Sequence, residues 1–167
     1  VAAIVGVYLL FTSLASDTGD PRTYLEHLRS NTDKRWHAAF YLASALAGDE
    51  HLELRYDPKF MADMAQVLDQ SIDSGETTEQ PVQFRSFVCR ALGHFHIAGS
   101  LPTLVRAADT QRDPNEVEVR LSALEAIAQL TDNIRRPLAE KLLPQAAALA
   151  RKSSDAVRSS PAGAETA

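Results

Sequence analysis

Apolar residues recur every three or four positions along most of the chain, which is the spacing of amphipathic helices. The widest apolar arc belongs to residues 118–130, EVRLSALEAIAQL. Placed at about 100° per residue, its apolar side chains together with Val117 fill roughly 220° of the circumference. The remaining arc holds Glu118, Ser122, Glu125 and Gln129. An arc this wide predicts a helix that neighbouring helices cover on several sides.

Turn and cap signals divide the chain into pairs of helices. Asp20-Pro21, Asp57-Pro58 and Asp113-Pro114 each place an N-cap residue before a proline at the first helical position. The spacing predicts three pairs, whose second helices cover residues 33–47, 81–95 and 118–130. A further helix is predicted for residues 134–152, which Pro144 should kink or split. Residues 153–167 should form a flexible tail or the start of a degenerate repeat.

The second helices align on an arginine. Arg35, Arg85 and Arg120 are each followed by apolar residues three and seven positions later, and by a small residue eight positions later. The small residue, Ala43, Gly93 or Ala128, should let a neighbouring helix approach closely. An arginine within a buried arc needs a partner. We therefore expect an acid of a neighbouring turn to tie consecutive repeats through Arg120, and the candidates are Asp33, Asp113 and Glu116.

This pattern resembles the HEAT-repeat family, whose helical hairpins stack into an α-solenoid. The clearest match is residues 101–130, with an apolar first helix, an acid-containing turn, a valine-arginine pair and an alanine-rich second helix. The resemblance covers about residues 21–130 and implies an all-α, right-handed α-solenoid of about three hairpins plus a partial fourth, within residues 17–152. With the apolar N-terminal segment, the chain is similar to bacterial membrane-anchored HEAT-repeat proteins, which implies protein binding or scaffolding.

Residues 1–16, VAAIVGVYLLFTSLAS, carry no charge. As a helix they span about 24 Å, somewhat less than the roughly 30 Å of bilayer hydrocarbon. We interpret them as the C-terminal part of a single transmembrane helix, preceding the repeat domain; the charges assign no side of the membrane to that domain. Two alternatives stay open. One is a signal-peptide core with a cleavage site at Ser13-Leu14-Ala15, and the other is a buried helix of the fold.

Composition and short motifs argue against catalysis and nucleic-acid binding. The formal net charge is −5, and no basic patch is visible. Cys89 is the only cysteine, which excludes an intrachain disulfide and a thiol-rich metal site. Asp17-Thr18-Gly19 has the letters of an aspartic-protease loop but follows a helical run instead of a strand. His94 and His96 point roughly 200° apart on a helix and cannot share a metal ion. We therefore predict no enzyme, no cofactor and no metal.

A protein partner is the remaining expectation. Trp36 and Tyr41 are candidate aromatic contacts, although packing at the end of the array would also explain them. Glu118 and Glu125 belong to an acidic face that is either solvated or suited to a basic partner. The predicted function is a membrane-tethered, non-catalytic scaffold. The alternative is a soluble or exported HEAT-type regulatory subunit that acts on a cofactor-carrying enzyme.

Overall fold

The computed structural model describes residues 20–30 and 35–159, and within these ranges the chain is helical, without strands. The α-helices are α2 (Pro21–Arg29), α3 (Arg35–Ala47), α4 (Pro58–Asp73), α5 (Glu79–Gly93), α6 (Leu101–Ala108) and α7 (Val117–Ser159). Short 3-10 helices connect some of them: η1 (Leu52–Tyr56), η2 (Ala98–Ser100) and η3 (Pro114–Glu116). The all-α class is thus confirmed. The predicted transmembrane segment 1–16 lies outside the described residues, and no described helix is long and apolar enough to cross a bilayer.

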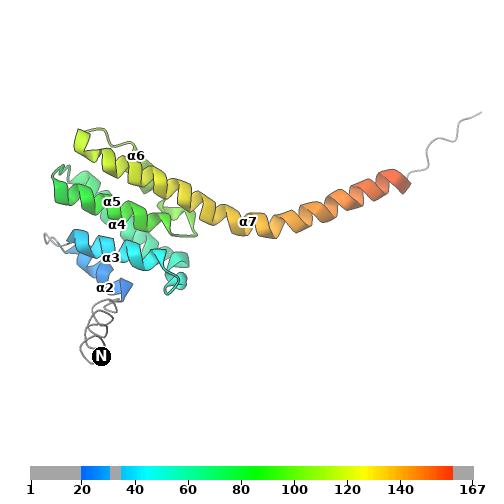
Figure 1. Cartoon of the computed structure of the whole chain (residues 1–167), viewed down its shortest axis with the longest axis horizontal. Helices are drawn as coiled ribbons and strands as arrows, with labels where there is room; N and C mark the ends of the chain where they lie inside the picture. Colours follow the sequence, from blue (N-terminus) through cyan, green and yellow to red (C-terminus); the bar gives the residue numbers. More distant parts are fainter. Residues whose placement is uncertain (1–19, 31–34, 160–167) are drawn as a thin grey trace, which may run out of the picture.

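The helices pack as successive hairpins in two layers (Figure 1). Within each hairpin, α2 contacts α3, α4 contacts α5, and α6 contacts α7. Between hairpins, α5 lies against both α3 and α7, while α4 contacts both α2 and α6. One layer therefore holds α2, α4 and α6, and the other holds α3, α5 and α7.

The predicted cap signals form in each pair. The Asp20 side chain accepts a hydrogen bond from the Arg22 backbone N–H at 3.0 Å. Asp57 accepts from the backbone N–H groups of Lys59 and Phe60 at 2.9 and 3.1 Å. These bonds satisfy N–H groups that have no partner inside their own helix. Asp113 caps the short η3 rather than α7 itself, through the Asn115 N–H at 2.8 Å.

Gly93, the small residue eight positions after Arg85, lets α5 and α7 approach closely. A Cβ atom added to Gly93 would lie 2.8 Å from the Ala126 Cα and 3.1 Å from its Cβ. Only glycine permits this approach, which confirms the expected close contact at this position. Ala128, the equivalent residue of the third pair, is exposed because no described helix packs beyond α7.

Exposed ion pairs join the helices of the other layer. Arg29 of α2 lies 2.8 Å from Asp63 of α4, and Arg106 of α6 pairs with Asp69 and Asp73 near the opposite end of α4. Helix α4 thus presents acids to its neighbours on both sides. Because the arginines are about half exposed, these pairs add little to the stability of the fold and mainly fix how neighbouring helices are aligned along their lengths.

Helix α7 differs from its prediction. The sequence predicts separate helices over residues 118–130 and 134–152, but α7 runs unbroken for 43 residues and includes Pro137 and Pro144. The prediction of two separate helices in this region was therefore wrong. Figure 1 shows a bend in the middle of α7, as expected where a proline ring removes a helical hydrogen bond. The helix also continues through residues 153–159, which the sequence assigns to a flexible tail or to the start of a degenerate repeat.

The burial of α7 also departs from the prediction. Val119, Ala123, Ala126 and Leu130 are buried, and so is Ser122, which the helical projection places on the polar side. Val117, Leu121 and Leu124 are instead about half exposed. The expected coverage on several sides is therefore wrong for the described chain. Helices α5 and α6 cover adjacent sides of α7, and no described residue covers its opposite side.

Candidate functional site

A buried ion pair joins the second and third hairpins. Arg85 of α5 and Glu116 of η3 are both 0% exposed, and the Arg85 Nη2 atom lies 2.9 Å from Glu116 Oε1. Arg112 Nη2 donates to the same oxygen at 2.9 Å. Burial lowers the pKa of Arg85, and the negative charge of Glu116 opposes this effect. Since an arginine pKa is so high, the guanidinium stays protonated.

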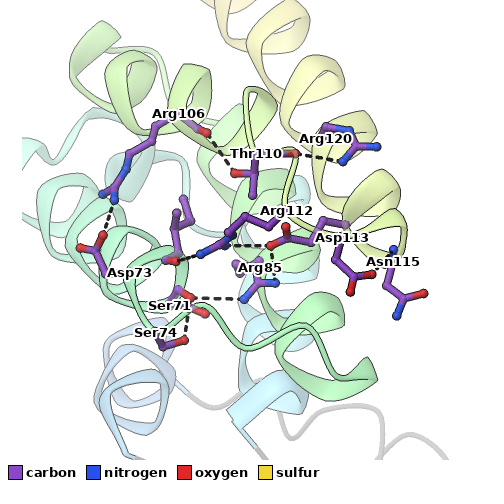
Figure 2. A network of polar contacts seen from close by, with 12 residues as sticks. Ser71, Asp73, Ser74, Arg85, Arg106, Thr110, Arg112, Asp113, Asn115 and Arg120 are labelled. Atoms are coloured by element: carbon purple, nitrogen blue, oxygen red, sulfur yellow. Dashed lines mark hydrogen bonds and ion pairs between the residues drawn. The ribbon is translucent and has the colours of Figure 1, made fainter.

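The same arginines cap the C-terminus of α4 (Figure 2). Arg85 Nη1 donates to the Ser71 carbonyl at 3.2 Å, and Arg112 Nη1 donates to the Ile72 carbonyl at 2.7 Å. The last carbonyls of a helix have no partner within it, and they carry the negative end of its dipole. This network therefore links α4, α5 and the connection between α6 and α7, which is a structural role.

The other two aligned arginines have different partners. Arg120 Nη1 donates to the Thr110 carbonyl at 2.9 Å (Figure 2), so the expected carboxylate partner of Arg120 is wrong. None of the three candidate acids is seen to pair with Arg120. Glu116 binds Arg85 and Arg112, and Asp113 caps η3. Asp33 lies outside the described residues. Arg35 of α3 stacks over the Phe84 ring of α5, with 4.5 Å from its Cζ atom to the ring centroid.

The candidate functional surface lies across the exposed sides of α3, α5 and α7. Phe40 of α3 meets Phe87 of α5 edge to face, with ring centroids 5.3 Å apart. Tyr41 lies beside Phe40 at 5.6 Å and stacks on Tyr24 of α2 at 5.8 Å. Arg90, one turn after Phe87, has its Cζ atom 5.4 Å from the Phe87 ring centroid.

The line of exposed side chains that runs from α3 to Arg90 of α5 continues onto α7 through a charged contact. Arg90 lies 3.8 Å from Glu118, and both side chains are about half exposed. Glu125 follows two turns later and is also exposed. We call the surface formed by Phe40, Tyr41, Phe87, Arg90, Glu118 and Glu125 the three-helix face. Its α3 side is aromatic and its α7 side is acidic.

A hollow adjoins the acidic side of this face. It has a volume of about 390 Å³ and lies between the start of α5 and the start of α7. Polar groups of Glu79, Gln83, Asn115 and Glu118 line it together with Val82.

The predicted aromatic contacts are only partly placed on this face. Tyr41 belongs to it, whereas Trp36 is partly buried against the core and stacks on His37 with centroids 3.6 Å apart. Sequence reasoning singled out neither Phe40 nor Phe87 as a contact residue. The helical projection of α3 contained the signal, because Phe40 lies opposite Leu42 and Leu46, which are buried.

His94 and His96 contact different neighbouring side chains. His94 Nδ1 lies 2.8 Å from the Gln129 side-chain nitrogen, and the His96 ring stacks on Tyr56 at 4.7 Å. Burial, and secondarily the charge of Arg55, lowers the pKa of both histidines and favours their neutral forms. Among the described residues, no group of histidine, cysteine and carboxylate side chains could hold a metal ion.

Cys89 has the character of a core residue. It is fully buried in α5, and burial raises the pKa of its thiol to about 12. Because the thiolate is the reactive form, this side chain is not a nucleophile at neutral pH. The Asp17-Thr18-Gly19 motif lies outside the described residues.

Comparison of the chain with protein-family models, curated proteins and solved structures finds no match.

Proposed function

We propose that the chain is a HEAT-like α-solenoid that acts as a non-catalytic scaffold, tethered to a membrane by residues 1–16. Its partner is a protein that binds the three-helix face. The order of packing supports the solenoid, because the main contacts between the described helices join hairpins that are neighbours in sequence, and corresponding helices form the same layer.

The exposed aromatic row carries the proposal of protein binding. Phe40 is 43% exposed although it contacts Phe87 of α5, a helix that buries most of its large apolar side chains. Aromatic residues and arginine are enriched at the centres of protein interfaces, where they supply much of the binding energy. The edge-to-face contact with Phe87 already holds the Phe40 ring, so binding loses little side-chain freedom there.

The charges of the face define the chemistry of the partner. Glu118 and Glu125 make the α7 side acidic, and Arg90 is the cation at the centre of the row. A complementary partner presents apolar residues over α3 and α5 and basic residues over α7. The charged rim mainly sets orientation and association rate, and the aromatic contacts supply most of the affinity.

Site-specific photo-crosslinking in the native host tests the binding face. A photoreactive amino acid replaces Phe40 in one variant and Leu52 in the control; Leu52 is 46% exposed and lies on η1, outside the face. We expect a discrete protein adduct from position 40, weakened when Glu118 and Glu125 are both changed to lysine. Equal adducts from positions 40 and 52, or none from position 40, would refute the proposal.

Membrane extraction tests the tether separately. The chain of residues 1–167 should stay with membranes after alkaline washing, whereas residues 17–167 should be released and should still show a helical circular dichroism spectrum. Release of the chain of residues 1–167 would contradict the tether. A mass shortened at Ser13-Leu14-Ala15 would instead show a cleaved signal peptide.

A further inference from the structure

The third hairpin leaves an apolar surface uncovered at the end of the array. On α6, Leu101 and Val105 lie on the side away from Thr103 and Arg106, which contact Asp69 of α4. On α7, Val117, Leu121 and Leu124 lie on the side away from Ala126, which contacts Gly93 of α5. Because α6 and α7 pack together, these two sides form one surface, which we call the open end. A contiguous exposed apolar patch of this kind marks an interaction site.

The second half of α7 carries its own exposed leucines. After Ile134, which still packs against the core, α7 projects from the bundle in Figure 1. Leu138, Leu142 and Leu149 are all more than half exposed there. We call residues 134–152 the arm.

The open end and the arm share one regular stripe along α7. Positions 117, 121, 124, 128, 131, 135, 138, 142, 145 and 149 follow each other at alternating intervals of four and three residues. Six of them hold large apolar side chains: Val117, Leu121, Leu124, Leu138, Leu142 and Leu149. An apolar repeat of 3.5 residues is the pattern of helices that pair as coiled coils.

We propose that this stripe binds the stripe of a second copy of the chain in the antiparallel direction, so that the arm of each copy covers the open end of the other. When two copies of α7 run antiparallel and are centred on position 133, each of the ten stripe positions of one copy faces a stripe position of the other. Val117 then meets Leu149 of the partner subunit, and Leu124 meets Leu142 of the partner subunit. The polar positions 131 and 135 meet each other at the centre.

Charge favours the antiparallel direction. The arm has five basic residues and one acidic residue, so its net charge is +4. The hairpin of residues 101–130 has five acidic and three basic residues, so its net charge is −2. Antiparallel pairing places each arm against the acidic hairpin, whereas parallel pairing places the two arms together and sets Arg135 against Arg135 of the partner subunit. The arm cannot cover its own open end, because α7 is one continuous helix that carries it away.

Two adjacent leucines provide a matched test. Leu142 lies on the stripe and is 54% exposed, whereas Leu143 lies about 100° away and is 67% exposed. The mass of the chain of residues 1–167 in a mild detergent is measured by sedimentation, and we expect twice its 18.2 kDa. Leu142→Glu should raise the dimer Kd at least about tenfold, and Leu143→Glu should change it less than about twofold. A monomeric wild-type chain, equal effects of the two changes, or two dimeric variants would each overturn the proposal.

Disulfide trapping tests the direction. Thr131→Cys and Arg135→Cys chains of different tag length are mixed and mildly oxidised. Antiparallel pairing predicts a disulfide between the two kinds of chain. Disulfides formed only between two Thr131→Cys chains, or only between two Arg135→Cys chains, would show parallel pairing and overturn the antiparallel arrangement. Cys89 does not interfere, because it is fully buried.

Discussion

Replacing Glu116 by leucine should strongly destabilise the fold. The change keeps a side chain of similar volume but removes the negative charge that faces Arg85, and both residues are fully buried. Arg112 is about 40% exposed and can turn to solvent, whereas Arg85 cannot. A buried charge that loses its partner typically costs about 3–5 kcal/mol. This is a large part of the roughly 5–15 kcal/mol that stabilises a domain.

The paired replacement separates the charge effect from packing. Arg85→Met alone also strands a charge, but Glu116 keeps Arg112 as a partner, so we expect a smaller loss of about 1–3 kcal/mol. With both changes together, no unpaired charge is left buried, and the chain should recover to within about 2 kcal/mol of wild type. We expect this recovery because the Arg85 Nε and Glu116 Oε2 atoms are buried without a hydrogen-bond partner within the described structure, so replacing both residues removes two unsatisfied polar groups.

Urea denaturation followed by circular dichroism measures these free energies by linear extrapolation. Glu118→Gln is the control, because it removes a carboxylate from the exposed pair with Arg90 and should change stability by less than about 1 kcal/mol. If Glu116→Leu costs no more than this control, or if the two buried changes are simply additive, the ion pair does not hold the hairpins together as described.

Two further predictions concern the contact between α5 and α7. Gly93→Ala should lower the unfolding free energy by about 1–3 kcal/mol, because the new methyl group meets the Ala126 backbone. Gly48→Ala, whose nearest atom would be 3.7 Å away, should be nearly neutral in the same urea titration, and equal effects would contradict the close approach. Stability should also fall as pH drops below about 6.5, because His94 has a lowered pKa in the folded state and accepts a proton more readily when unfolded. Urea midpoints measured between about pH 8 and pH 5 should show a shallower decline for His94→Gln, and an unchanged slope would exclude His94 as the cause.

The local patterns of the sequence were sufficient for the starts of α2 and α4 and for one contact between helices, but not for α7, which is one helix where the sequence predicts two. Aspartate before proline marks a helix start wherever it occurs here, because the cap bond and the fixed proline dihedral act within a few residues. The alignment on Arg85 also predicted that a neighbouring helix approaches closely at Gly93, and α7 does so there. Both signals depend only on spacing along the chain.

Partner choice and coverage were decided by the tertiary structure. Glu116 was one of three acids that could have paired with an arginine, and only the packing of η3 against α5 places it beside Arg85 instead of Arg120. Likewise, periodicity shows that Leu121 and Leu124 share a side of α7, but it cannot show whether a neighbour covers that side. Periodicity is a property of one helix, whereas burial and pairing depend on which other helices arrive, and the sequence alone does not state that.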